Sequence, residues 1–396
     1  MRILLATAGS RGDVEPFVAL AERARALGHE VRLVTPDNSG VEMDDLDVVS
    51  MGIDYTRMIE DQGVSLIGAL RNYRSVVRPI MRGVIVGAAR AALDYEPDLV
   101  VYHPKVLSAP LVSDALGVPH AMVEIVPAVT PTRDFPAAGT LARGIGRLNR
   151  LTYLAGSAAA AMFHSELAEV RAMIGTRERG SSDPAVTLIP ISPSILPRPH
   201  DWPASVQLTG RWTRAHRARA LQPEAADFIA DGSFIYAGFG SMATGDAAAR
   251  GRAIIDTARA RGSRCLIATG LGGIDVPPDH LGADVLVVRN VPHAAVLPYA
   301  TAAVHHGGIG TVHAAMESAT PSVIVPFIAD QPFWGSRLHE SGLTPAPIPR
   351  RALTKPALSA ALDGAEQRRR RITDVAKAIS AEDGTLTALT LITSIH

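Results

Sequence analysis

The stretch His305-His306-Gly307-Gly308-Ile309-Gly310-Thr311 follows the apolar run 302–304 and leads into a segment of helix-forming residues. A strand that ends in glycines and then starts a helix presents unpaired backbone N–H groups and the positive end of the helix dipole. Glycines let the backbone approach an anion, Thr311 adds a hydroxyl in the first helical turn, and His306 can donate from an imidazole nitrogen. The stretch therefore predicts a phosphate-binding turn, with a role in packing alone as the alternative.

Short apolar runs alternate with longer segments of helical periodicity along nearly the whole chain. Such alternation implies right-handed crossovers and mostly parallel sheets with helices on both faces. The pattern predicts an α/β fold with two doubly wound, Rossmann-like domains that face each other across a cleft. The expected strands span 3–6, 31–34, 99–102, 121–125, 234–237, 264–268, 285–288, 302–305 and 322–325, and the expected helices span 17–27, 108–116, 247–261, 293–299, 311–318 and 331–341.

A proline-rich stretch, 190–212, separates the two halves of the chain and suits a stiff connector. The length of 396 residues also fits two domains of common size. We expect an N-terminal domain over 1–200 and a C-terminal domain over 201–380. A terminal helix over 381–396 would then pack back on the N-terminal domain.

Composition narrows the classes of partner. Lys+Arg and Asp+Glu both total 39, so the net charge gives no reason to expect a nucleic-acid partner. No secretory signal is visible and the single cysteine, Cys265, lies in an apolar run, so we expect a cytoplasmic protein with a buried thiol. The apolar stretch 151–163 is too short to span a membrane, and we expect a buried helix there and no integral membrane segment.

The first expected strand ends at Thr7-Ala8-Gly9-Ser10-Arg11-Gly12-Asp13. The glycines allow a tight turn, but their spacing is not that of the dinucleotide-binding fingerprint. Asp13 has two interpretations that exclude each other only in part. It is a helix N-cap, or it is a general base that accepts a proton from a bound hydroxyl.

Polar residues also follow strands in the second half. Ser241 comes after a glycine turn and either binds a phosphate or caps the next helix. The stretch Asn290-Val291-Pro292-His293 can seat a flat ring through its backbone groups. Asp330 and Gln331 supply a carboxylate and an amide, the groups that hold vicinal sugar hydroxyls. Because ligands of doubly wound sheets lie at the carboxyl ends of the strands, these residues together predict a nucleotide-sugar site.

With these motifs, the chain resembles the family 1 glycosyltransferases of the GT-B fold. Within that family it is similar to sterol 3-beta-glucosyltransferases and to actinobacterial antibiotic and macrolide glycosyltransferases. The resemblance is most specific in the C-terminal half; in the N-terminal half it is concentrated near Asp13 and looser around 130–136. Many relatives have a tryptophan that stacks on the nucleobase where this chain has Asn290. The matching stretches are 9–16, 238–242, 291–293, 305–311 and 326–335, and 345–349 is similar to the sterol branch.

The resemblance implies a role for each matching residue. Asp13 would activate the acceptor hydroxyl, and Asp330 and Gln331 would hold the sugar. The other implied roles are these: Ser10, Arg11 and Gly12 shape the loop beneath donor and acceptor; Ser241, His306, Gly307, Gly308, Gly310 and Thr311 hold the diphosphate; Asn290, Val291 and His293 lie at the nucleobase; and Thr132, Phe135 and Trp334 line the acceptor pocket.

The expected reaction is an inverting transfer of a hexose, with UDP-glucose favoured over a dTDP sugar, to a hydroxyl of a hydrophobic acceptor. The resemblance implies that the N-terminal domain binds the acceptor and that the C-terminal domain binds the nucleotide sugar. We expect no metal and no cofactor, because a helix dipole and hydrogen bonds can neutralise the departing diphosphate. The expected state is a monomer or a weak homodimer. The alternatives are a nucleotide-sugar epimerase and a non-catalytic helper protein of the same fold.

Overall fold

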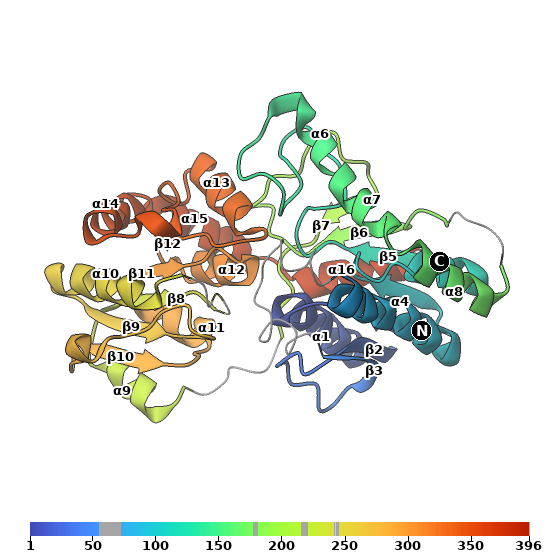
Figure 1. Cartoon of the computed structure of the whole chain (residues 1–396), viewed down its shortest axis with the longest axis horizontal. Coiled ribbons are helices and arrows are strands. Elements are labelled where there is room, and N and C mark those ends of the chain that lie inside the picture. The colour runs from blue at the N-terminus through green and yellow to red at the C-terminus, as the bar shows by residue number, and fades with distance from the viewer. Residues whose placement is uncertain (55–72, 177–180, 215–220, 241, 243–244, 396) are drawn as a thin grey trace.

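The computed structural model describes residues 1–54, 73–176, 181–214, 221–240, 242 and 245–395, which build two parallel sheets with helices packed around them (Figure 1). The strand order of the first sheet is β3-β2-β1-β4-β5-β6-β7, and that of the second is β10-β9-β8-β11-β12. The expected α/β fold of two Rossmann-like domains is confirmed.

The strands of the first sheet are β1 (Arg2–Ala6), β2 (Glu30–Asp37), β3 (Asp47–Asp54), β4 (Leu99–Tyr102), β5 (His120–Val123), β6 (Val186–Ile189) and β7 (Val206–Leu208). Those of the second sheet are β8 (Phe234–Gly238), β9 (Arg264–Ala268), β10 (Val285–Val288), β11 (Ala300–His305) and β12 (Ser322–Ile324). The helices are α1 (Arg11–Ala26), α4 (Arg78–Tyr95), α5 (Ala109–Leu116), α6 (Asn149–Thr152), α7 (Leu154–Ala161), α8 (His164–Ile174), α9 (Pro223–Ala230), α10 (Ala247–Ala260), α11 (His293–Val296), α12 (Ile309–Glu317), α13 (Gln331–Glu340), α14 (Lys355–Glu366), α15 (Arg369–Ser380) and α16 (Gly384–Thr393).

Each sheet has a point at which the strand order reverses. In the first sheet β1 lies between β2 and β4, and in the second β8 lies between β9 and β11. Loops diverge at such a switch point and leave room for a ligand beyond the carboxyl ends of the strands. The register pairs Ala6 with Tyr102 and Gly238 with His305, so the loops after β1 and β4 are neighbours, as are those after β8 and β11.

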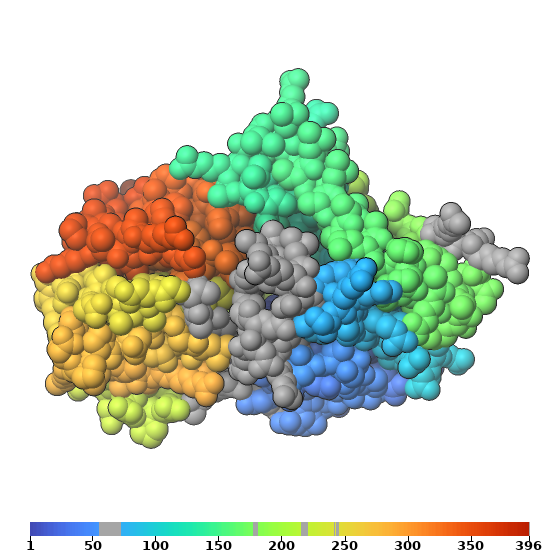
Figure 2. Space-filling model, in the orientation of Figure 1, coloured from blue at the N-terminus to red at the C-terminus, as the bar shows by residue number. Residues whose placement is uncertain are grey.

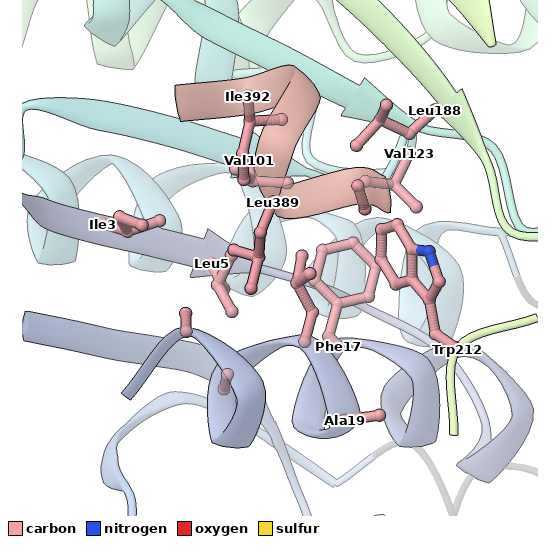
Figure 3. Packing of buried hydrophobic residues seen from close by; sticks show 14 of the residues in the cluster. Ile3, Leu5, Phe17, Ala19, Val101, Val123, Leu188, Trp212, Leu389 and Ile392 are labelled. Carbon is pink, nitrogen blue, oxygen red and sulfur yellow. The ribbon is translucent and has the colours of Figure 1, made fainter. Parts of the chain in front are cut away.

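Alternate side chains of β1 enter different cores. Ile3 and Leu5 pack with α1 and with the terminal helix α16, whereas Leu4 packs on the opposite face with α4. Figure 3 shows Leu389 and Ile392 of α16 against the first sheet. The last helix of the chain is therefore part of the core that supports the loop after β1.

A shared apolar cluster joins the two sheets. It combines Phe135 and Ile189 from the first half of the chain with Val312, Ile324 and Phe333 from the second. The rings of Phe135 and Phe333 lie 5.5 Å apart, edge to face. Such burial fixes the two sets of strand-end loops relative to each other.

The structure also corrects the sequence analysis. β3, β6 and β7 were not expected, and β7 continues the first sheet beyond residue 200. α7 was expected to be buried but has no buried residue, because none of the described residues forms a layer that covers its alanine-rich surface. Cys265 is buried, as expected. No helix in the described part of the chain is long and apolar enough to cross a bilayer.

Candidate active site

Asp13 lies in the first turn of α1, at the switch point of the first sheet. The N-cap is Ser10, not Asp13: the Asp13 carboxylate accepts a hydrogen bond of 2.8 Å from the Ser10 N–H and thereby closes a capping box. This bond occupies Oδ2 and leaves the carboxylate at the edge of the sheet. The helix-capping and chemical interpretations of Asp13 are thus compatible.

Two residues that the sequence analysis did not single out lie beside Asp13. His103 Nε2 is 3.4 Å from Asp13 Oδ1, and Lys105 Nζ is 3.4 Å from Oδ2. Both follow β4, whose carboxyl end adjoins that of β1. Their position after an expected strand was visible in the sequence, but the pairing of that strand with β1 was not.

The hydrogen bonds of His103 determine its tautomer. Its Nδ1 accepts from the Lys105 backbone N–H at 3.1 Å, so the ring proton resides on Nε2 and points toward Asp13. Burial lowers the pKa of His103 and keeps the imidazole neutral. His103 therefore donates to the carboxylate without adding a charge.

Opposing effects act on the pKa of Asp13. Burial raises it, but the Lys105 charge, the His103 hydrogen bond and the Ser10 N–H together hold it well below its ordinary value. Asp13 is ionised throughout the working range of an enzyme. Gly9 is required here, because its φ is +145° and a Cβ would lie 2.0 Å from Asp13 Oδ2.

The turn after β11 has the geometry expected of an anion-binding helix start. Gly308 is the N-cap of α12, and Thr311 is the third residue of the helix. Gly307 has φ +89°, and a Cβ on Gly308 would lie 2.6 Å from His306 Nε2. The glycines therefore let the His306 ring pack against the turn. Gly310 is exposed in the first helical turn.

His306 is a neutral donor or acceptor in this turn. Burial lowers its pKa to about 4. Its Nδ1 is buried and makes no hydrogen bond of ordinary geometry with the described residues, although the Gly238 backbone lies near enough to the ring to oppose this fall in the pKa. A buried ring nitrogen beside a helix N-terminus is suited to a ligand oxygen.

The structure also describes most of the other residues expected at the donor site. Ser241 is outside the described residues. Asn290 is exposed and Val291 half-buried, directly after β10. His293 Nε2 lies 3.0 Å from the Tyr236 hydroxyl, and burial lowers the pKa of His293 to about 4.

The two remaining loop residues lie in the first domain. Arg11 forms an ion pair with Glu15 at 2.9 Å, and Gly12 lies beside Arg11 in the first turn of α1.

Asp330 precedes α13 and faces the first domain. Burial raises its pKa to about 6, and the nearby negative charge of Asp13 adds to the rise. Its Oδ2 accepts from Trp334 Nε1 at 2.9 Å. The two carboxylates, one from each domain, are thus close enough to affect each other.

The side chain of Gln331 is engaged with its own loop. Its Oε1 accepts from the backbone N–H groups of Phe327 and Ile328 at 2.8 and 3.1 Å, and its Nε2 lies 3.4 Å from the Met242 sulfur. The amide therefore holds the loop that presents Asp330.

The three residues expected in the acceptor pocket are buried. Phe135 and Trp334 belong to the apolar cluster that joins the sheets. Thr132 donates to Asp201 at 2.5 Å and is fully buried. None of the three side chains is more than 1% exposed, and their role in an acceptor pocket stays a prediction.

Two family models match the chain. An erythromycin biosynthesis protein CIII-like C-terminal domain matches residues 275–383, and a glycosyltransferase family 28 N-terminal domain matches residues 3–124. The O-mycaminosyltylonolide 6-deoxyallosyltransferase of Streptomyces fradiae is 32% identical over 96% of this chain and 92% of its own length. A sterol 3-beta-glucosyltransferase of Arabidopsis thaliana is 29% identical over 98% of this chain and 67% of its own length.

Solved glycosyltransferase structures have the same fold. The glycosyltransferase of kitacinnamycin superimposes with a TM-score of 0.76 at 18% identity over 100% of this chain and 98% of that one. The glycosyltransferase VinC in complex with dTDP gives 0.66 at 19% identity over 100% of this chain and 99% of that one. Together with the sequence matches, this fold places the chain in the family 1 glycosyltransferases, with the GT-B architecture.

Proposed function

We propose that the protein is an inverting glycosyltransferase that moves a hexose from a nucleoside diphosphate to a hydroxyl of a hydrophobic natural product or sterol-like acceptor. The observation that supports this most directly is the half-buried, ionised carboxylate of Asp13, held by His103 and Lys105 beside the first switch point. The anion-binding turn at α12 and the carboxylate of Asp330 lie in the opposite domain.

The reaction is a single displacement. The acceptor oxygen forms a bond to the anomeric carbon as the bond from that carbon to the diphosphate oxygen breaks, and the electron pair leaves with the diphosphate. Asp13 accepts the acceptor proton while the N-terminus of α12 and His306 stabilise the growing negative charge. An α-linked donor then gives a β-glycoside.

Donor and acceptor are proposed by class. The two relatives are named for 6-deoxyallosyl and glucosyl transfer, both of which concern hexoses, and VinC was solved in complex with dTDP. We favour UDP-glucose, with a dTDP hexose as the second donor to test, because the Asp330 carboxylate offers an acceptor to sugar hydroxyls. Val291, Asn290 and the Arg11 loop are proposed to lie along the nucleotide.

The test is turnover of UDP-glucose and of a dTDP-hexose with a panel of sterol and macrolide alcohols, followed by NMR of the product's anomeric configuration. A β-glycoside is expected. An α-glycoside from an α-linked donor would refute the inverting mechanism, and donor isomerisation without an acceptor would indicate an epimerase.

Asp13→Asn is the matching variant. It keeps the shape of the side chain but removes its basicity, so transfer should fall about 10²–10⁴-fold while nucleoside-diphosphate binding stays within about twofold. Asp37→Asn, at the end of the adjacent strand β2, is the control and should keep full activity. A nearly active Asp13→Asn protein would leave Asp13 with its capping role alone.

A further inference from the structure

An arm of the N-terminal domain, residues 139–162, exposes large apolar side chains. It includes α6 and α7, and its tip projects beyond both domains (Figures 1 and 2). Leu148, Leu151 and Leu154 are 58%, 58% and 61% exposed. Others in the arm that are exposed are Leu141, Ile145 and Met162. Single exposed apolar residues are ordinary, but this concentration in one projecting segment marks an interaction surface.

The charge of the arm has one sign. Arg143, Arg147 and Arg150 are exposed between its leucines, and residues 135–165 contain no aspartate or glutamate. The nearest acidic residue on the C-terminal side, Glu166, is bonded to Arg78. Asp201, whose charge interacts with Arg150, accepts hydrogen bonds from Thr132 and from the Arg133 N–H at the base of the arm. The arm is therefore apolar and cationic in a protein whose formal net charge is zero.

We propose that the arm docks this protein on the surface of an anionic lipid bilayer. Exposed leucines can enter the boundary between head groups and acyl chains, while arginines between them pair with lipid phosphates. The binding is peripheral, because α7 is only 8 residues long.

Charge distinguishes this occupant from a second copy of the chain. A symmetric contact between two arms would place arginines of one copy against arginines of the other, with no acidic residue of the arm to compensate. An anionic bilayer supplies both the apolar layer and the opposite charge, so it satisfies both features of the arm.

The experiment is co-sedimentation of the full chain with vesicles of phosphatidylglycerol and phosphatidylcholine, and with vesicles of phosphatidylcholine alone. One variant carries Leu148→Ser, Leu151→Ser and Leu154→Ser; another carries Arg143→Ser, Arg147→Ser and Arg150→Ser. The matched control, Arg351→Ser, Lys355→Ser and Arg370→Ser, removes the same charge from exposed positions of the other domain.

We expect binding to the anionic vesicles that weakens with salt, and little binding to phosphatidylcholine. Each arginine removed should weaken partitioning about fivefold, so the arginine variant should lose about a hundredfold and the control should bind as the unaltered protein does. The leucine variant should also bind less.

Equal binding to both vesicle types, no binding, or equal losses in the arginine variant and its control would overturn the proposal. So would a protein dimer, seen by light scattering, that the leucine variant abolishes. The salt titration of the unaltered protein tests the proposal even where a variant fails to fold.

Discussion

Replacing Asp330 with asparagine should change the pH dependence of stability. In the folded chain burial raises the pKa of Asp330 to about 6, from an ordinary value of 3.8. Above pH 6 the folded protein must keep an unfavourable buried charge, which the unfolded chain solvates freely. Below pH 3.8 the Asp330 carboxyl is protonated in both the folded and the unfolded chain, so the free-energy cost of burying its charge vanishes.

The difference between these two pKa values lowers the free energy of unfolding by about 3 kcal/mol at pH 8 and by about half of that at pH 5. Asp330→Asn has no charge to bury, and its amide oxygen can still accept from Trp334. The variant should therefore gain stability relative to the unaltered protein as the pH rises from 4 to 8. The gain should level off above pH 6 to 7.

The assay is urea unfolding of both proteins at several pH values between 4 and 8, with the exposed Asp134→Asn as control. The control should show a difference in free energy of unfolding that does not vary with pH. A pH-independent difference for Asp330→Asn as well, or one that grows toward acid, would contradict the buried-charge argument.

Three further outcomes are expected. His103→Ala removes the N–H that orients Asp13 and should lower kcat about tenfold or more with little change in the KM for the donor. His103→Gln should restore part of the rate through its amide N–H. An equal rise of KM in both variants would show a merely structural role. Gln331→Ala leaves the N–H groups of Phe327 and Ile328 without their acceptor and should lower the free energy of unfolding by about 1–3 kcal/mol, while Gln331→Glu, which keeps the oxygen, should lose less. Transfer should persist in excess chelator, because the α12 N-terminus meets the charge of the diphosphate; strict dependence on added magnesium would refute this account.

The strands at the two switch points could be predicted because both of their faces are buried, which gives a continuous apolar run. β1 and β4 show this pattern, and so do β8 and β11. β3 could not be predicted, since it is an edge strand that starts with an exposed aspartate and has one buried residue. β7 has three residues, too few for any periodicity. Hydropathy also failed at α7, because an alanine-rich helix has the same composition whether a layer covers it or not.

Candidate site residues could be proposed from the sequence where one loop holds all the residues concerned, as at 305–311 and at Asp13. They could not be proposed where residues come together only through the pairing of strands. His103 and Lys105 lie some ninety positions from Asp13, and only the neighbouring positions of β1 and β4 bring them together. The same applies to Trp334 and Phe135: their sequence context fits a pocket, but contacts between the domains bury them.

The placement of the two carboxylates indicates which of them serves as the base under the proposed mechanism. A pKa of about 6 would by itself make Asp330 the stronger base, because proton transfer improves as the pKa approaches the working pH. Asp330, however, lies on the same domain as the α12 turn that is proposed to hold the leaving diphosphate. Inversion requires the acceptor to approach the anomeric carbon from the side opposite that diphosphate, as in inverting glycoside hydrolysis, where base and leaving group lie on opposite faces of the sugar. The acceptor therefore approaches from the first domain, and Asp13 is the carboxylate that this domain places at the site. We therefore expect Asp330→Asn to remove an acid limb near pH 6 from the activity profile, and Asp13→Asn to remove the activity itself.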